Sequence, residues 1–234
     1  QGVSSAASDV YKRQIYMYTE AFGRASYLVS RSRGKKSTVS KALFIPLSVL
    51  EMEVEHLNKR DLHRIKETRI CFPLNDVCCD PVKNVLALFL SEVLFRVVKD
   101  TEPDPRLFDY LYESIHLLEY ADKGIANFHM VFLLGLLHHL GIFPNMESHR
   151  VGYYFDMLNG VFTDHIPMHR HYLNKVESAF FSRLLRISFE NMSLYGFSRQ
   201  ERVRIIHRIL EYYCLHLPDF PEIKSLSVMQ SLFD

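Results

Sequence analysis

The sequence predicts an α+β protein in which a small β-barrel precedes an α-helical domain. Between residues 15 and 79, short β-rich runs alternate with turn residues, which is typical of a small barrel or sandwich. From Asp80 onward, apolar residues recur at helical spacing instead. The net charge changes sign at the same place: residues 1–79 hold 13 basic and 8 acidic side chains, and residues 80–234 hold 15 basic and 19 acidic side chains. We therefore expect two domains, 15–79 and 80–234, that differ in fold and in charge.

The strands of the barrel are predicted from runs that are rich in β-branched and aromatic residues. Gly23 supplies a turn after the first run, and polar segments separate the later runs. Over residues 49–55 apolar and acidic residues alternate, as they do in a strand with one buried face. The predicted strands are Ile15–Thr19, Ala25–Ser30, Ala42–Glu55 and Leu62–Ile70.

The segment Gln1–Gln14 has little hydrophobic periodicity and joins abruptly to the β-rich sequence that follows it. It resembles translated adaptor sequence. We therefore expect residues 1–14 to be a non-native tail outside the fold, and we leave the charges of Lys12 and Arg13 out of any basic patch.

The helical part begins with a strong start signal, because Asp80 is a capping residue and Pro81 suits the first helical position. The third predicted helix is apolar on most sides and should be the central helix of a bundle. The predicted helices are one from Asp80 to about Lys99, one that opens at Pro103 and Pro105, and one from Gly124 to Gly141.

Residues 145–174 break the helical pattern. Glycine, proline and aromatic residues over this stretch favour a loop with a short hairpin inserted into the helical domain. Ser198 and Glu201, three residues apart, form a capping box at the start of a later helix. The helices expected after the hairpin are Lys175–Tyr195, Ser198–Leu217 and Ile223–Phe233.

The composition is that of an ordinary globular protein. With 48% hydrophobic and 24% charged residues, the chain of 234 residues is long enough to bury a core. The four cysteines are too few and too irregularly spaced for a disulfide framework, and no CxxC pair exists to hold zinc. Reduced thiols and the lack of a signal peptide favour a cytoplasmic protein. The apolar stretch Gly124–Phe143 contains asparagine and histidines, so a core helix is preferred over a membrane span.

The clearest candidate for a binding site is a basic segment between Ala21 and Leu50 that contains no acidic residue. Four of its cations lie in a Ser/Gly-containing loop between two predicted strands, and such a loop suits phosphate groups. Tyr16, Tyr18 and Tyr27 are candidates for stacking on bases. A solvated basic loop without a ligand is the alternative. The predicted DNA-binding residues are Arg24, Arg31, Arg33, Lys35, Lys36 and Lys41.

A second basic group lies on the predicted helix Ser198–Leu217. Helical spacing places Arg204 and Arg208 on one face, with Arg202 to the side. A solvent-exposed face with acidic partners is the simpler interpretation. The alternative is a docking face for phosphate or an acidic peptide. The predicted partner-binding residues are Arg199, Arg202, Arg204 and Arg208.

Histidines suggest a metal site at one point, where His165, His169 and His171 lie within seven residues and Asp164 precedes them. Their spacing matches no standard ligand pattern, so we predict no metal and no cofactor. The sequence also lacks phosphate-loop, dinucleotide, GxSxG and HExxH motifs. We expect no enzyme, and a metal-dependent nuclease that uses this histidine group is the least favoured hypothesis.

The order of several blocks resembles the bacterial RecO family of DNA repair proteins, in its Bacteroidetes form. The blocks span nearly all of residues 15–234, and no single motif is diagnostic. They are Tyr18–Glu55, Leu62–Glu67, Asp80–Asp100, Ala126–Asn145 and Leu217–Phe233.

The resemblance implies an N-terminal OB-fold and a recombination mediator of the RecF pathway in the bacterial cytoplasm, at the nucleoid. Such a mediator binds single- and double-stranded DNA and anneals complementary strands. With RecR as partner, it helps to load RecA onto DNA that is coated by single-stranded DNA-binding protein. It also contacts the acidic C-terminal tail of the coating protein. Because that tail ends in apolar residues after acids, its site should combine an apolar pocket with a basic rim, and helix Ser198–Leu217 is a candidate.

Two departures from the family matter. Some members hold zinc with cysteines in a hairpin that corresponds to about Val151–His171. This chain has no cysteine there, so the resemblance does not imply a zinc site in it. The family barrel also begins with a strand upstream of Ile15. We therefore expect the OB-fold to lack its first strand and to leave an unpaired sheet edge. A helical interaction scaffold that does not bind DNA is the alternative function.

Overall fold

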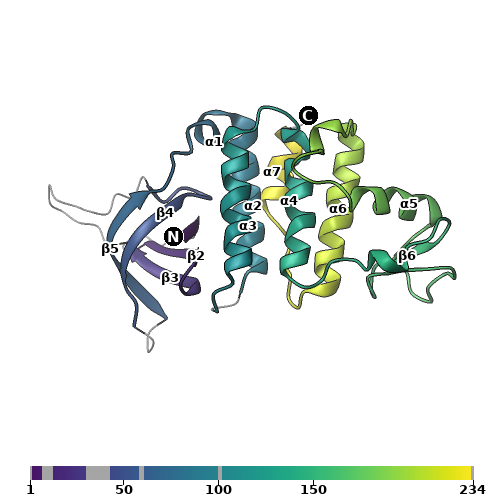
Figure 1. The fold of residues 1–234 in the computed structure, drawn as a ribbon, viewed down its shortest axis with the longest axis horizontal. Helices are drawn as coiled ribbons and strands as arrows, with labels where there is room; N and C mark the ends of the chain where they lie inside the picture. Colours follow the sequence, from purple (N-terminus) through teal and green to yellow (C-terminus); the bar gives the residue numbers. More distant parts are fainter. Residues whose placement is uncertain (1, 7–12, 30–42, 58–60, 100–101, 233–234) are drawn as a thin grey trace. The chain divides into compact units, whose positions relative to one another are not determined.

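The computed structural model describes residues 2–6, 13–29, 43–57, 61–99 and 102–232 (Figure 1). The chain is an α+β protein that forms two compact units: Gln1–Ala121 with Glu222–Asp234, and Asp122–Pro221. The predicted boundary between residues 79 and 80 therefore falls inside the first unit. The helix Pro81–Val97 contacts the barrel strand Gly2–Ala6, and the last helix, Ser225–Leu232, packs against the same helix.

The barrel is a closed sheet of five strands in the order β1-β2-β3-β5-β4. Strand β3 pairs with β5 in parallel, and the other pairs are antiparallel. Alternate residues of β2 and β3 point inward, so Ile15, Met17, Tyr27 and Val29 fill the core together with Leu50 of β4. The strands are β1 (Gly2–Ala6), β2 (Arg13–Thr19), β3 (Gly23–Val29), β4 (Val49–Glu55) and β5 (Leu62–Ile70).

The N-terminal residues are part of this sheet, and the expectation that the barrel lacks its first strand is wrong. Strand β1 pairs with β2 from Gly2↔Thr19 to Ala6↔Ile15, and with β4 at Gly2↔Leu50 and Val3↔Val49. Strand β2 also begins earlier than predicted, at Arg13. Backbone pairing does not require apolar periodicity, which is why the side-chain pattern of residues 1–14 gave no strand signal.

Strand β4 is shorter than the predicted run Ala42–Glu55. The backbone makes a turn at residues 45–48, in which the N–H of Ser48 donates to the carbonyl of Ile45. Pro46 occupies the second position of this turn, and Leu47 has a φ of 62°. A proline and a left-handed residue cannot continue a strand, so β4 begins at Val49.

In the described ranges, the first unit carries four α-helices. Asp80 and Asp104 cap α2 and α3 with side-chain oxygens, and each is followed by proline at the first helical position, as the sequence predicts for α2. The short helix α1 was not predicted. It is held by the buried carboxylate of Glu119, which accepts from the N–H groups of Asp76 and Val77. These helices are α1 (Asn75–Cys79), α2 (Pro81–Val97), α3 (Pro105–Tyr120) and α7 (Ser225–Leu232).

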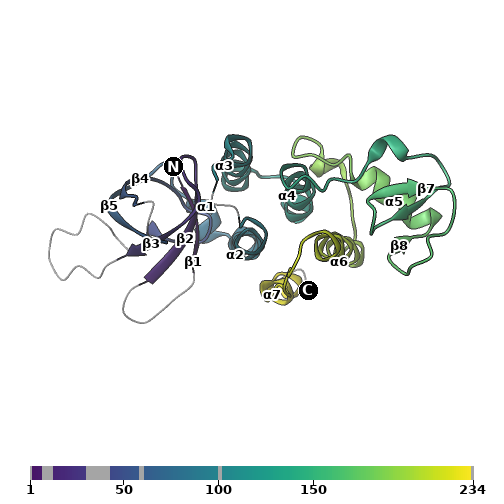
Figure 2. The ribbon, with the colours of Figure 1, turned by 90° about the horizontal axis from the view of Figure 1, so that it is seen from below.

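The second unit places a small sheet at one end of a group of helices (Figure 2). Helix α4 is buried along most of its length, as expected for a central helix. The predicted hairpin is confirmed as β6 and β7, and β8 adds a third strand in the order β7-β6-β8. The elements are α4 (Ile125–His139), β6 (Tyr154–Asp156), β7 (Val161–Thr163), β8 (Tyr172–Leu173), α5 (Lys175–Leu184) and α6 (Arg199–His216), with short 3₁₀ turns at Met146–Ser148 and Met192–Leu194.

Helix α5 ends at Leu184, about midway through the predicted range Lys175–Tyr195. Beyond it, the side chain of Asn191 accepts from the N–H of Ser188 and donates to the carbonyl of Arg186. Asparagine that binds nearby backbone groups competes with helix formation, which explains the early end. In the described part of the chain, no helix is long and apolar enough to cross a membrane.

Candidate partner-binding groove

Most of the predicted DNA-binding residues lie outside the described residues: Arg31, Arg33, Lys35, Lys36 and Lys41 all fall between 30 and 42. Arg24 is described, and its contacts are internal to the first unit. Its guanidinium donates to the carbonyls of Phe95 and Val98 at the end of α2, at 3.1 and 2.8 Å. It also lies over the rings of Tyr16 and Phe95. These contacts give Arg24 a structural role that joins the barrel to α2.

The three tyrosines considered for base stacking are packed inside the first unit. Tyr27 is fully buried in the barrel core, and burial raises its pKa to about 12. Tyr18 is 7% exposed, and its hydroxyl accepts from the N–H of Asp104 at 3.1 Å. The ring of Tyr16 contacts Phe95 edge to face, with centroids 4.9 Å apart. Because the rings of Tyr18 and Tyr27 are covered, they do not offer stacking faces.

The basic residues of α6 separate onto different faces. Ser198 and Glu201 form the predicted capping box, which fixes the first turn. Arg204 and Arg208 line a groove between α5 and α6, as their spacing predicts. Arg202 points elsewhere and donates to the carbonyl of Phe197, and Arg199 is exposed in the first turn outside the groove lining.

This groove lies between the facing sides of α5 and α6, within the second unit, and has a volume of about 530 Å³. Its apolar lining comes from β8 and both helices: Leu173, Val176, Phe180, Phe181, Leu184 and Ile205. Its polar lining consists of Glu177, Arg183, Glu201, Arg204, His207, Arg208 and Glu211. The groove thus combines a largely apolar floor with charged groups at its sides, which is the character of a specific binding site.

The charges of the groove are not equivalent. Arg208 is paired with Glu211 at 2.8 Å and with Glu177 at 3.4 Å, and the hydrogen bond that it donates to Glu211 is the largest cause of its raised pKa. Glu201 accepts from the N–H of Ser198, and the hydrogen bonds from Ser198 lower its pKa. By contrast, Arg204 is exposed and makes no hydrogen bond or ion pair with any described residue. Arg204 is therefore the cation of α6 that is ready for an anionic ligand.

Helix α5 supplies much of the lining of this groove, and the charge pattern of the sequence did not predict its role. Phe180, Arg183 and Leu184 belong to a helix whose apolar residues recur at helical spacing. Val176 is 80% exposed, which is unusual for a residue of this size at the start of a helix. The amphipathic pattern was visible in the sequence, but the face that it leaves uncovered depends on the packing against α6.

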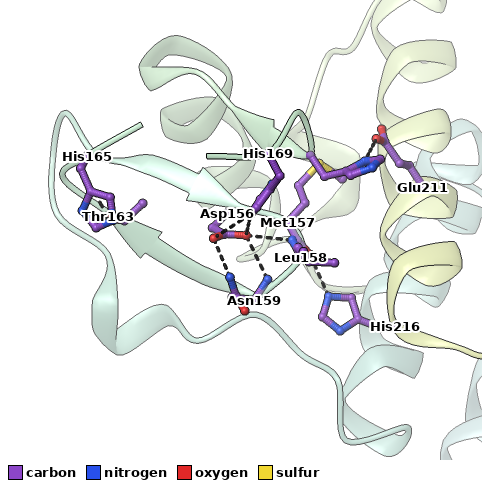
Figure 3. A network of polar contacts seen from close by, with 10 residues as sticks. Asp156, Met157, Leu158, Asn159, Thr163, His165, His169, Glu211 and His216 are labelled. Atoms are coloured by element: carbon purple, nitrogen blue, oxygen red, sulfur yellow. Dashed lines mark hydrogen bonds and ion pairs between the residues drawn. The ribbon is translucent and has the colours of Figure 1, made fainter. Parts of the chain in front are cut away.

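Two histidines near the small sheet contact carboxylates (Figure 3). Asp156 accepts from the backbone and side chain of Asn159 and contacts His169 at 3.3 Å. Burial raises the pKa of Asp156, but the bonds from Asn159 and the charge of His169 outweigh it and lower the pKa. His171 contacts Glu211 at 3.4 Å.

The remaining histidine of the predicted group, His165, is exposed and contacts Asp164 at 3.0 Å. Within the described ranges, no three His, Cys, Asp or Glu side chains come together in a way that could hold a metal ion. The contact of His171 with Glu211 and that of the His216 ring with the carbonyl oxygen of Met157 attach the small sheet to α6. All four cysteines are free thiols.

Comparison with known proteins gives a consistent result over both units. The family model described as "Recombination protein O C terminal" matches residues 79–226. A DNA repair protein RecO of Bacteroides fragilis is 44% identical over 94% of this chain and 91% of the relative. The proteins of the same name from Azobacteroides pseudotrichonymphae and Flavobacterium psychrophilum are 41% and 33% identical, over 94% and 92% of this chain and 91% and 90% of the relatives.

Proposed function

Because this chain belongs to the RecO family of DNA repair proteins, we propose that it is a recombination mediator that acts by binding and not by catalysis. In this role it binds single- and double-stranded DNA and anneals complementary strands. With RecR it assists the loading of RecA onto DNA that is coated by single-stranded DNA-binding protein. The sequence contains no enzyme motif that would compete with this interpretation.

The DNA site that we propose is on the barrel of the first unit, an OB-fold in this family. Five of the six basic residues that the sequence singles out lie between β3 and β4, in a stretch without acidic residues. OB-folds bind single strands with loops of this kind, through cations that contact the phosphates. Arg24 is left out of this site because its guanidinium is bonded to the end of α2.

The observation that carries the proposal is the groove between α5 and α6. A peptide that ends in apolar residues after a stretch of acids needs an apolar floor beside arginines. The groove supplies Phe181, Leu184 and Ile205 for the apolar end, and Arg183 and Arg204 for the acids. We therefore assign the groove to the C-terminal tail of single-stranded DNA-binding protein.

Strand annealing on coated DNA tests this function. Complementary oligonucleotides would be annealed by this chain when bare, when coated with intact single-stranded DNA-binding protein, and when coated with the same protein without its tail. We expect acceleration on bare and on normally coated DNA, and a loss of acceleration where the tail is absent. No acceleration on bare DNA would contradict the mediator function. Equal acceleration with and without the tail would contradict the assignment of the groove.

A further inference from the structure

Three aromatic rings are stacked in a column at one end of the barrel, where β2 turns into β3 and where β4 leads to β5. The ring of Phe22, in the turn between β2 and β3, stacks on the ring of His56, with centroids 3.9 Å apart and 4° between the planes. His56 stacks in turn on His63 of β5, also at 3.9 Å and with 20° between the planes. The three rings therefore form one column with nearly parallel faces, called the ring column below.

The inner end of the ring column is fixed to the barrel. His63 is buried, and its Nδ1 accepts from the N–H of Leu57 at 3.3 Å. Its ring also lies against Tyr27 in the barrel core, with centroids 5.9 Å apart. Burial is the largest cause of the lowered pKa of His63, so the ring is neutral at pH 7 and keeps this bond. The column thus stands on a ring that the core holds in place.

The outer end of the ring column is Phe22, and its turn is fixed by the buried side chain of Thr19. The hydroxyl of Thr19 accepts from the N–H of Phe22 and donates to the carbonyl of Gly23, both at 3.0 Å. Gly23 has a φ of 57°, which glycine adopts without steric cost. Phe22 is partly exposed, and among the described residues His56 is the ring that stacks on it. Phe22 is therefore held in position before any ligand binds.

The chemistry of the ring column favours a flat aromatic ligand. A further ring placed on Phe22 continues a stack of parallel faces, and every nucleobase has such a face. Charges of both signs are mixed in the sequence around the three rings, so the column adds little attraction for phosphate. These charged residues are Glu20, Glu55 and Asp61, and Lys59, Arg60 and Arg64.

We propose that Phe22, supported by His56 and His63, stacks on an unpaired base of bound DNA. This assignment rests on the proposed DNA-binding function and adds to it a contact with bases where the basic loop contacts phosphates. It supplies the stacking ring that the buried Tyr18 and Tyr27 do not offer. A base inside a duplex is already stacked on its neighbours, so the ring column strengthens the binding of single strands and not of duplexes.

Tryptophan fluorescence tests the contact directly. The chain contains no tryptophan, so Phe22→Trp introduces a single emitting side chain into the ring column. The full chain with this substitution is titrated with a single-stranded oligonucleotide and with a strand of the same length that has abasic sites in place of its bases. Phe72→Trp is the matched control, because Phe72 is also partly exposed in the first unit but contacts Tyr112 and His116 edge to face.

We expect the ordinary strand to quench the emission of the Phe22→Trp variant and the abasic strand to leave it unchanged. Neither strand should quench the Phe72→Trp variant. No quenching by the ordinary strand, or equal quenching by both strands, would overturn the stacking contact. If the unchanged chain binds neither strand in an anisotropy titration, the proposed DNA binding fails as well, which separates the two failures.

Phe22→Leu measures the contribution of the ring to affinity, because leucine keeps an apolar side chain without an aromatic face. We expect binding of the ordinary single strand to weaken by about tenfold. Binding of the abasic strand and of a duplex should stay unchanged, and so should the slope of log affinity against log salt, since no phosphate contact is lost. Equal weakening on all three DNAs, or unchanged affinity for the ordinary strand, would overturn the proposal. Thermal unfolding checks the fold, and if Phe22→Leu is unfolded the Phe22→Trp emission decides.

Discussion

Arg208 on α6 is bonded to Glu177 on α5, with 3.4 Å between Nη2 and Oε1, and so joins the two helices that form the groove. Its other terminal nitrogen contacts Glu211 on its own helix at 2.8 Å. Two of the three carboxylates of the groove therefore share one guanidinium. The consequence is that Arg204, four residues away on the same face, is left to attract a ligand.

Arg204→Glu should weaken binding of the tail peptide by about tenfold without lowering the melting temperature. The physical reason is that Arg204 is exposed and makes no hydrogen bond or ion pair with a described residue, so the change breaks no bond within the described chain. Peptide titration by anisotropy measures the affinity, and thermal unfolding checks the fold. Arg199→Glu on the same helix is the matched control, because Arg199 does not line the groove. An equal loss of affinity in both variants would show that overall charge matters and the groove does not.

Arg24→Ala should lower the free energy of unfolding by about 2 kcal/mol, since two charge-assisted bonds to backbone carbonyls are lost. Chemical denaturation measures this effect. At low denaturant, the salt dependence of DNA binding should stay that of the unchanged chain, because this cation is committed to Phe95 and Val98. A smaller salt slope with normal stability would instead place Arg24 on the DNA.

Glu92→Gln should destabilise the packing of α7 against α2. The two helices are far apart in the sequence, and Glu92 on α2 binds the start of α7. The carboxylate of Glu92 accepts from the N–H groups of Lys224 and Ser225 and from the hydroxyl of Ser225. Burial raises its pKa, but these bonds outweigh burial and lower the pKa. We expect a loss of about 1–2 kcal/mol in urea unfolding. Glu222→Gln, exposed and close by in sequence, is the control, and an equal loss there would refute the role of Glu92.

Stability should fall as the pH falls from about 6 toward 3, in part because of His129. Burial in α4, assisted by the charge of Arg202, lowers the pKa of His129 to about 3. In the unfolded chain the histidine has a pKa of about 6.5, so below this pH it binds a proton that the buried His129 of the folded chain does not bind. The stability that this group contributes is complete above pH 6.5 and is lost at up to about 1.4 kcal/mol per pH unit below it.

The measurement for this prediction is urea unfolding at several pH values between 7 and 4, for the unchanged chain and for His129→Gln. The variant should show a shallower fall of stability over this range, whatever its stability at pH 7. His207→Gln, on an exposed side chain, is the control. Parallel curves for the unchanged chain and His129→Gln would contradict a neutral buried His129.

The parts of the fold that follow from local chemistry were predictable. Asp80 with Pro81, and Ser198 with Glu201, are start signals that act within one turn, and both helices begin where these residues indicate. The end of α5 was not predictable from periodicity, because it depends on the bonds of Asn191 to the backbone. Strand β1 gave no signal, because its place is set by pairing with β2 and β4.

The residues of the candidate site were likewise predictable only in part from the sequence. The spacing of Arg204 and Arg208 placed them on one face of α6, and both line the groove. The contribution of α5 could not be read from the sequence, because it depends on which side of that helix α6 covers. Arg24 and the barrel tyrosines were chosen by residue type, and their packing against α2 and Asp104 became visible only in three dimensions.

The most direct test of the mediator function is titration of a labelled single-stranded oligonucleotide at several salt concentrations, followed by anisotropy. It compares the unchanged chain with a variant in which Arg31, Arg33, Lys35 and Lys36 are all alanine. We predict that the variant binds much more weakly and that the slope of log affinity against log salt falls by about 3, since each phosphate contact contributes about 0.7. Identical affinity and identical slope in the two proteins would contradict DNA binding by this loop.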